Sequence, residues 1–143
     1  MIKRFNIRVY GLLIKDGAIL VNEELIKGRN IIKFPGGGLD WGEGIADCLK
    51  REWMEELGLE INIVQHFYTT DFFQQSAFDD SQIISIYYLV DADLPKHLVN
   101  HVANEKTYWL PLSEVHEATF TLLIDRVVGK LLMANRHTNK PIE

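Results

Sequence analysis

Residues 37–59 read GGLDWGEGIADCLKREWMEELGL, and the interpretation of the rest of the chain starts from this segment. Five glycines fall within residues 36–44. After them, the apolar residues recur at helical spacing, and Gly58 stands where a glycine commonly ends a helix. The segment therefore predicts a glycine loop that leads into a helix over Ile45–Leu57.

Three acidic residues share one face of this predicted helix. At about 100° per residue, Glu52, Glu55 and Glu56 fall within about 100° of one another. A bare cluster of this kind costs a few tenths of a kcal/mol for each like-charged pair. A divalent cation among the carboxylates would remove that repulsion, and oxygen ligands favour hard cations such as Mg²⁺ or Mn²⁺. Taken alone, the cluster also fits a solvated helix face. The apolar stripe beside it consists of Ala46, Leu49, Trp53 and Leu57.

The residues around the cluster favour the metal-binding interpretation. The glycines at 36–38 let the backbone approach a ligand closely and point a carbonyl or N–H group toward it. Arg51 precedes Glu55 by four residues, so it can pair with a carboxylate on the same helix and hold its orientation.

The flanking sequence predicts an α/β fold with a mixed β-sheet between helices. A strand, an Asp16-Gly17 turn and a second strand at the start indicate a hairpin, which argues against a doubly wound parallel sheet. We treat residues 1–143 as one domain, with 71–80 as a loop and 136–143 as a loose tail. The predicted strands are Phe5–Ile14, Ala18–Glu23, Ile31–Phe34, Leu59–Thr70, Ile83–Val90 and Thr107–Leu110, and the second predicted helix is Thr119–Met133.

Composition limits the function classes. Fifteen Lys and Arg against 20 Asp and Glu give a net charge of −5, which argues against a nucleic-acid or anionic-membrane binder. No apolar run approaches the ~18 residues of a membrane span, and the N-terminus has no signal-peptide pattern. The single cysteine, Cys48, excludes an intrachain disulfide and a Cys-based zinc site. We expect a cytoplasmic protein.

The segment resembles the Nudix box, the signature of Nudix hydrolases. In words, that pattern is Gly, five residues, Glu, seven residues, Arg-Glu, an aliphatic residue, any residue, Glu-Glu, any residue, Gly and an aliphatic residue. Trp53 departs from the pattern because its slot is usually Ile, Leu or Val, and we expect a bulkier core contact there. The matching residues are Gly37, Glu43, Arg51, Glu52, Glu55, Glu56, Gly58 and Leu59.

The resemblance implies an α/β/α sandwich and a metal-dependent hydrolase. Such enzymes cleave the diphosphate linkage of a nucleoside diphosphate derivative by attack of water, with Mg²⁺ or Mn²⁺ as cofactor. The resemblance places the metal ligands at Glu52, Glu55 and Glu56, with the Gly37 carbonyl as a further ligand. It makes Glu43 and Arg51 structural partners of the loop and helix.

The resemblance leaves the general base and the substrate open. The base varies in this family, and the candidates here are Glu52 and Glu105. Lys27 and Arg29 could meet phosphates and Phe73 could stack on a base, although loop residues of these types are also common on ordinary surfaces. Subfamily markers are absent, so the substrate stays either a nucleotide-sugar or a nucleoside triphosphate.

Two other classes of protein are alternatives. A catalytically inactive Nudix-fold sensor would bind a nucleotide without turnover, and an acidic helical scaffold would leave the glycine loop and Arg51 unexplained. Nudix proteins are often dimers, so a homodimer is compatible with the resemblance, although no residue pattern indicates an interface.

Overall fold

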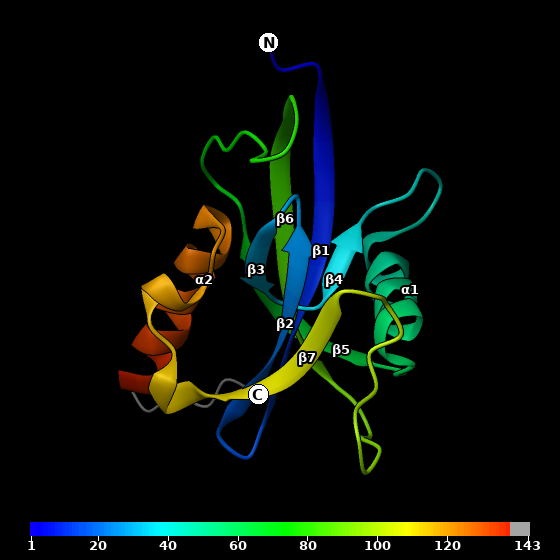
Figure 1. Cartoon of the computed structure of the whole chain (residues 1–143), viewed down its shortest axis with the longest axis vertical. Coiled ribbons are helices and arrows are strands. Elements are labelled where there is room, and N and C mark those ends of the chain that lie inside the picture. Colours follow the sequence, from blue (N-terminus) through cyan, green and yellow to red (C-terminus); the bar gives the residue numbers. More distant parts are fainter. Residues whose placement is uncertain (138–143) are drawn as a thin grey trace.

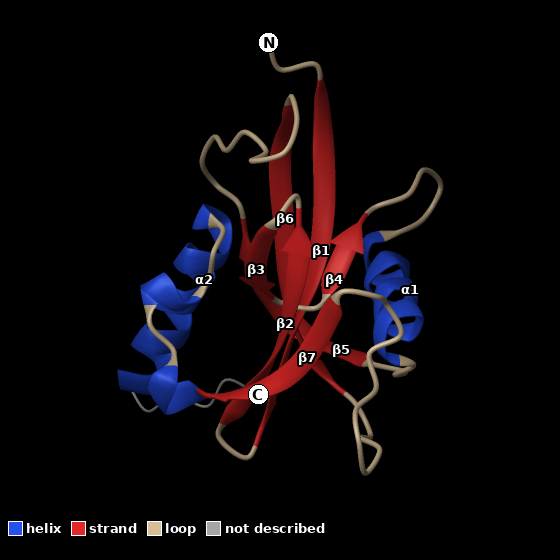
Figure 2. Ribbon diagram, viewed as in Figure 1, coloured by secondary structure: helices blue, strands red, loops and turns tan. Residues whose placement is uncertain are grey.

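The computed structural model describes residues 1–137. The described residues form seven strands and two α-helices. Figure 1 shows α1 and α2 on opposite sides of the sheet. Two short 3₁₀ turns precede α2 (Figure 2). The elements are β1 (Arg4–Lys15), β2 (Ala18–Ile26), β3 (Arg29–Lys33), β4 (Gly36–Gly38), α1 (Ile45–Leu57), β5 (Asn62–Thr69), β6 (Ser81–Asp91), β7 (Glu105–Pro111), η1 (Leu112–Glu114), η2 (Glu117–Thr119) and α2 (Leu123–His137).

The sheet is mixed, as predicted. Its strand order is β3-β2-β1-β6-β5, with β4 paired to β1 and β7 paired to β2. Only the β1–β6 pair is parallel among the described residues, and the β1–β2 hairpin closes at Lys15 and Ala18. The predicted α/β/α sandwich is confirmed.

Helix α1 has the predicted bounds, whereas several other elements do not. Residues 36–38 were expected to be loop but form β4, because backbone pairing with β1 needs no side chains. Strand β2 continues past Glu23 to Ile26 because β3 and β7 pair with it on both edges. Strand β5 begins at Asn62, later than predicted, because Leu59 and Ile61 turn into the core instead.

Helix α2 begins four residues later than predicted. Thr119 ends a 3₁₀ turn and its hydroxyl accepts the His116 N–H at 3.0 Å, while the Thr121 hydroxyl accepts the Ile32 N–H at 2.9 Å. These tertiary contacts compete with the helical pattern and delay the helix to Leu123. The helix then runs through His137, two residues into the predicted tail, and residues 138–143 lie outside the described part of the chain.

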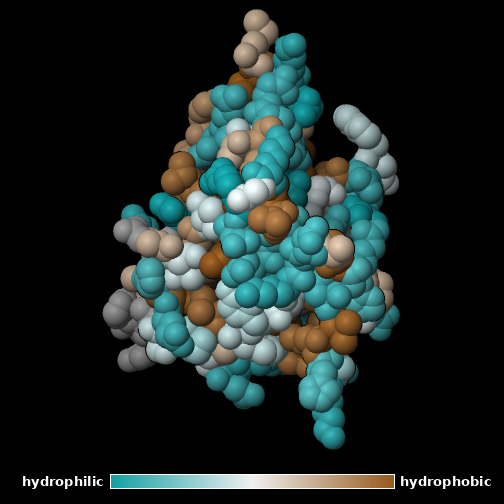
Figure 3. Space-filling view, in the orientation of Figure 1, coloured by the Kyte–Doolittle hydropathy of each residue, from teal (hydrophilic) through white to brown (hydrophobic). Residues whose placement is uncertain are grey.

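Two apolar clusters hold the helices to the sheet. The cluster under α2 includes Tyr87, Phe120 and Val128, and the cluster under α1 includes Leu20, Leu49 and Trp53. Hydrophilic side chains cover most of the face viewed in Figure 3, and the hydrophobic ones lie in separate patches. Within residues 1–137, no helix has both the length and the hydropathy that crossing a membrane requires.

Trp53 packs in the α1 cluster, as its apolar position predicted. It is fully buried, and its indole Nε1 donates to the Pro35 carbonyl at 3.1 Å. The Gly11 N–H donates to the same carbonyl at 2.9 Å. A Cβ at Gly11 would lie 2.7 Å from the indole Cζ2, so the large ring at position 53 depends on the missing side chain at position 11.

A buried polar pair joins α2 to the sheet. The Tyr87 hydroxyl of β6 donates to the Asp125 carboxylate, which is only 2% exposed. Burial raises the pKa of Asp125 to about 6, although the Tyr87 hydrogen bond and the nearby Lys33 and Arg8 partly oppose the rise. The folded state therefore holds a proton on this carboxyl more tightly than the unfolded chain does.

The contact between Gly11 and Trp53 predicts a strongly coupled pair. Gly11→Ala should lower the free energy of unfolding by ~1–3 kcal/mol, because the ring has no room to move. Trp53→Leu leaves a cavity that the new methyl group at position 11 can partly fill. The double variant should therefore lose less free energy of unfolding than the two single variants lose together. Urea denaturation of the three variants measures this coupling, and simple additivity would contradict the contact.

The Asp125 carboxyl predicts a pH-dependent stability. Its folded pKa lies above the ~3.9 of an unfolded Asp, so its stabilising contribution is complete below about pH 4 and falls as the pH rises through about 6. Relative to Asp125→Asn, the wild type should lose about 2–3 kcal/mol across this range. Denaturant titrations at several pH values measure the difference. Tyr87→Phe removes the hydroxyl that donates to ionised Asp125, so the loss of stability should occur at a higher pH in this variant. A stability difference between the wild type and Asp125→Asn that does not vary with pH would exclude this effect of Asp125.

Candidate active site

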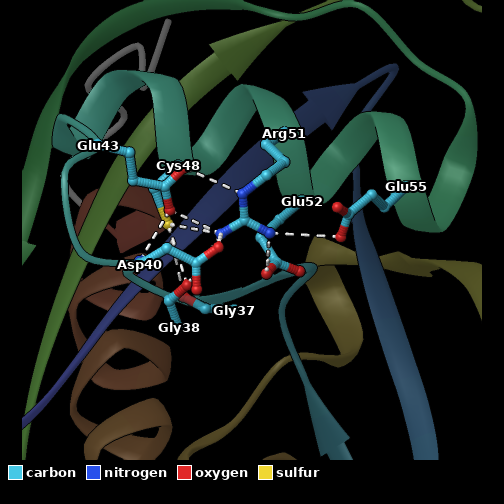
Figure 4. A network of polar contacts seen from close by, with 8 residues as sticks. All are labelled: Gly37, Gly38, Asp40, Glu43, Cys48, Arg51, Glu52 and Glu55. Atoms are coloured by element: carbon cyan, nitrogen blue, oxygen red, sulfur yellow. Dashed lines mark hydrogen bonds and ion pairs between the residues drawn. The ribbon is translucent and has the colours of Figure 1, made fainter.

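Arg51 of α1 is the centre of a polar network that joins the helix to the glycine loop (Figure 4). Its Nε and Nη2 donate to the Glu43 carboxylate at 3.0 and 2.6 Å, and Nη2 also donates to the Gly38 carbonyl at 3.1 Å. Its Nη1 pairs with Glu52 at 2.9 Å and with Glu55 at 3.3 Å. One guanidinium thus holds three of the box carboxylates.

Glu43 closes the loop before the helix. Its carboxylate accepts the Asp40 N–H at 2.9 Å in addition to the bonds from Arg51. The Arg51 hydrogen bond, followed by the Asp40 N–H, lowers the pKa of Glu43 to about 2. Burial, and then the Glu43 charge, raises the pKa of the neighbouring Cys48 thiol to about 12, which keeps that thiol unreactive at neutral pH.

Glu52 lies directly against the backbone of Gly37. A Cβ at Gly37 would fall 2.4–2.6 Å from the carboxyl atoms of Glu52, so only glycine allows this approach. Gly37 and Glu52, two of the predicted metal-binding positions, are therefore in contact. Glu55 is another predicted position, and its side chain is 59% exposed and pairs with Arg51.

Glu56 faces the sheet instead of solvent. The residue is 8% exposed, and its Oε2 has no hydrogen-bond partner among the described residues. Burial, and then the charge of Glu105 on β7, raises the pKa of Glu56 to about 8, although Lys33 opposes the rise. Burial also raises the pKa of Glu105, while a hydrogen bond from Asn22 lowers it. The structure thus brings together Glu56 and Glu105 from two distant segments.

The donor atoms of this site fit a hard divalent cation. Among residues 1–137, no three Asp, Glu, His or Cys side chains form a preformed metal cluster. Arg51 holds Glu52 and Glu55 while Glu56 turns toward the sheet, so the three predicted ligands do not converge. The unpartnered, buried Glu56 oxygen beside other carboxylates is nevertheless a hard oxygen donor of the kind that Mg²⁺ or Mn²⁺ prefers.

A cavity of about 440 Å³ adjoins this cluster. Glu24 and Lys33, which influence the pKa of Glu56, also line the cavity and pair with each other at 3.0 Å. Arg8 lines it from β1, and its Nε donates to the Tyr10 hydroxyl at 2.6 Å. The segment 74–79 and the start of α2, including Asp125, complete the wall. A volume within the ~300–1,000 Å³ of small-molecule pockets suits a nucleotide-sized ligand.

The three predicted substrate-binding residues occupy different places. Arg29 lines the cavity. The Lys27 ammonium donates to the Phe78 carbonyl at 3.0 Å and lies 5.8 Å from the centre of the Phe78 ring, so it fastens the loop instead of facing the cavity. Phe73 is 63% exposed and is not among the lining residues, whereas Phe78 is.

The sequence interpretation missed several polar residues around the cavity and the acidic cluster. Their signal was a polar residue on an otherwise apolar face, such as Asn22 between Leu20 and Glu24 on β2. Asp125 similarly interrupts the face of α2 that contains Val128. The missed residues are Arg8, Asn22, Glu24, Lys33, Tyr87 and Asp125.

Solved structures with the same fold come from several bacteria. A MutT structure from work on the fish pathogen Aliivibrio salmonicida and on Vibrio cholerae is 20% identical, with a TM-score of 0.70 over 93% of this chain and 99% of that chain. The E. coli ORF135 protein is 20% identical, with a TM-score of 0.75 over 99% and 96%. A MutT NUDIX hydrolase from Burkholderia pseudomallei is 17% identical, with a TM-score of 0.71 over 90% and 97%. At these identities the likeness shows the fold alone.

The family follows from a match over nearly the whole chain. A search of curated proteins found no match. The family model described as NUDIX domain, in contrast, matches residues 4–139, a range that includes the Arg51 network, Glu56, Glu105 and the cavity. The chain therefore belongs to the NUDIX family.

Proposed function

We propose that this protein hydrolyses the diphosphate linkage of a nucleoside diphosphate derivative, either a nucleotide-sugar or a nucleoside triphosphate. The observation that carries the proposal is the buried Glu56 carboxylate with an unpartnered oxygen, next to a cavity lined by Arg8, Arg29 and Lys33. Carboxylates that bind a cation and side-chain cations that meet phosphates are the two requirements of this reaction. A cytoplasmic location fits this substrate class and stays a prediction.

Residues of the 37–59 segment would bind the cation and hold the loop and helix together. Glu52, Glu55 and Glu56 would hold Mg²⁺ or Mn²⁺, with the Gly37 carbonyl as a further ligand, once Glu52 and Glu55 exchange their ion pairs with Arg51 for the cation. The bound cation would neutralise the diphosphate and lower the pKa of the attacking water. Glu43 and Arg51 would keep the loop and helix in register, since their bonds connect the two segments.

The general base would be Glu105 or Glu52. Glu105 is the stronger candidate because burial raises its pKa, which brings a carboxylate closer to the basicity that proton transfer at neutral pH needs. Glu52 already accepts a hydrogen bond from Arg51 at 2.9 Å, which occupies an oxygen that would have to take the proton.

The cavity would orient the rest of the substrate. Arg29 lines it and would meet phosphate oxygens, and Arg8 would do so from the β1 side. The contact of Lys27 with Phe78 supports a role in holding the loop over the cavity. A stacking role for Phe73 stays a prediction, because this ring would have to move to reach the substrate.

A substrate screen tests the proposed hydrolase. Nucleoside triphosphates and nucleotide-sugars would be incubated with Mg²⁺ or Mn²⁺, and we expect turnover of at least one that EDTA abolishes. Glu56→Gln should lower kcat by more than the ~10–100-fold typical of losing an outer-shell partner. Glu60→Gln, on an exposed Glu beyond the helix end, should leave kcat unchanged. Product analysis in ¹⁸O-labelled water then identifies the attacked phosphorus.

Two results of this screen would contradict the proposal. Full activity in EDTA would exclude the cation. Nucleotide binding without turnover across the panel would favour the Nudix-fold sensor instead.

The choice of general base predicts a kinetic separation. Glu105→Gln should lower kcat by about 10²–10⁴-fold with little change in KM, because the side chain keeps its size but cannot take a proton. Glu114→Gln, an exposed Glu in η1, is the matched control. A kcat near that of the wild type would assign the base role to Glu52.

A further inference from the structure

Asn22 is a buried polar residue to which the proposed function assigns no role. It lies on β2 between Leu20 and Glu24, and alternation along a strand puts these three side chains on one face. Leu20 belongs to the apolar cluster under α1. Asn22 therefore faces the same layer as α1, which is also the layer into which Glu56 turns.

The side-chain amide of Asn22 is only half satisfied. The residue is 0% exposed, and its Nδ2 donates to the Glu105 Oε2 at 3.3 Å. This bond fixes the amide, since the reverse orientation would put its oxygen against a carboxylate. The Oδ1 atom has no partner among the described residues, and the same holds for the Glu56 Oε2 atom. A buried acceptor without a donor costs about 1–3 kcal/mol, so two of them near Glu105 need an explanation.

The charges around these two oxygens favour a cation as the missing partner. Lys33, which pairs with Glu24 at 3.0 Å, is one cation beside three carboxylates, Glu24, Glu56 and Glu105. The buried Glu56 carboxylate, the half-buried Glu105 carboxylate and an amide oxygen are hard oxygen donors, which suit Mg²⁺ or Mn²⁺. A cation with its waters can be the partner of both unpartnered oxygens at once.

We propose that Asn22 is a cation-binding residue, whose Oδ1 contacts the divalent cation at Glu56, directly or through one of its waters, while its Nδ2 positions Glu105. This inference rests on the proposed metal-dependent function. It adds to the site a residue of β2 that lies outside the 37–59 segment.

Mn²⁺ titration of the metal-free protein, followed by electron paramagnetic resonance, tests the proposal without any substrate. Asn22→Leu, nearly equal in size, should raise the Kd for Mn²⁺ by about 10–100-fold. Asn62→Leu, on an exposed Asn of β5, should leave the Kd unchanged. Asn22→Asp keeps an oxygen and should bind Mn²⁺ at least as tightly as the wild type.

Thermal unfolding with Mg²⁺ and with EDTA provides a second readout. Asn22→Leu removes the unpartnered oxygen and also the Nδ2 bond to Glu105, so the quantity compared is the Tm increase on adding Mg²⁺ relative to EDTA, which should be lost. Asn22→Asp adds a third carboxylate, so its Tm increase with Mg²⁺ should exceed that of the wild type. If Asn22→Leu does not fold, the Asp variant still decides.

The outcomes separate this inference from the proposed function. Equal Mn²⁺ affinity in the wild type and in Asn22→Leu would overturn the role of Asn22 and leave the hydrolase proposal standing. An Asn22→Asp protein with no enhanced Mg²⁺ response would do the same. A wild-type protein that binds no Mn²⁺ would overturn both.

Discussion

The ion pairs of Arg51 are the constraint on which the site depends. Glu43, Glu52 and Glu55 come within reach of one guanidinium, and without that charge they would repel one another across the loop and the helix. The Gly38 carbonyl accepts from the same group at 3.1 Å, so the backbone of the glycine loop is held too. Arg51 thus couples the position of the loop to the position of the helix before any cation binds.

Glu56 differs from Glu52 and Glu55 because it is buried and its Oε2 has no hydrogen-bond partner among the described residues. Arg51 pairs with Glu43, Glu52 and Glu55, whereas Glu56, on the edge of the same helix face that lies nearest the sheet, is buried. There the charge of Glu105, which accepts a hydrogen bond from Asn22, acts on Glu56. The acidic face of the helix therefore contains carboxylates paired with Arg51 and one with an unpartnered oxygen, where the proposed cation would bind.

Local patterns predicted the elements well, and long-range pairing explains where they failed. The bounds of α1 follow from its own apolar spacing and from the Gly58 cap, both readable in one segment. Strand β4 and the start of α2 depend on partners far along the chain, such as the β1 backbone and the Ile32 N–H, and no local pattern contains them. The predicted site residues came from one segment for the same reason. Asn22, Arg8 and Asp125 reach the site only through the register of the sheet and the docking of α2.

The acidic composition of the chain is compatible with an anionic ligand because the acids of the cavity wall have partners. Arg8, Arg29 and Lys33 line the cavity together with Glu24, Asp79 and Asp125, although the whole chain has a net charge of −5. Glu24 pairs with Lys33, Asp79 pairs with Arg4, and Asp125 accepts a hydrogen bond from Tyr87. A cation at Glu56 would add positive charge at the adjoining end, where the protein by itself is acidic. A diphosphate would then lie between side-chain cations and a metal ion, and neither source alone would be sufficient. The proposed recognition of phosphate would thus depend on the local arrangement of charge and not on an excess of basic residues.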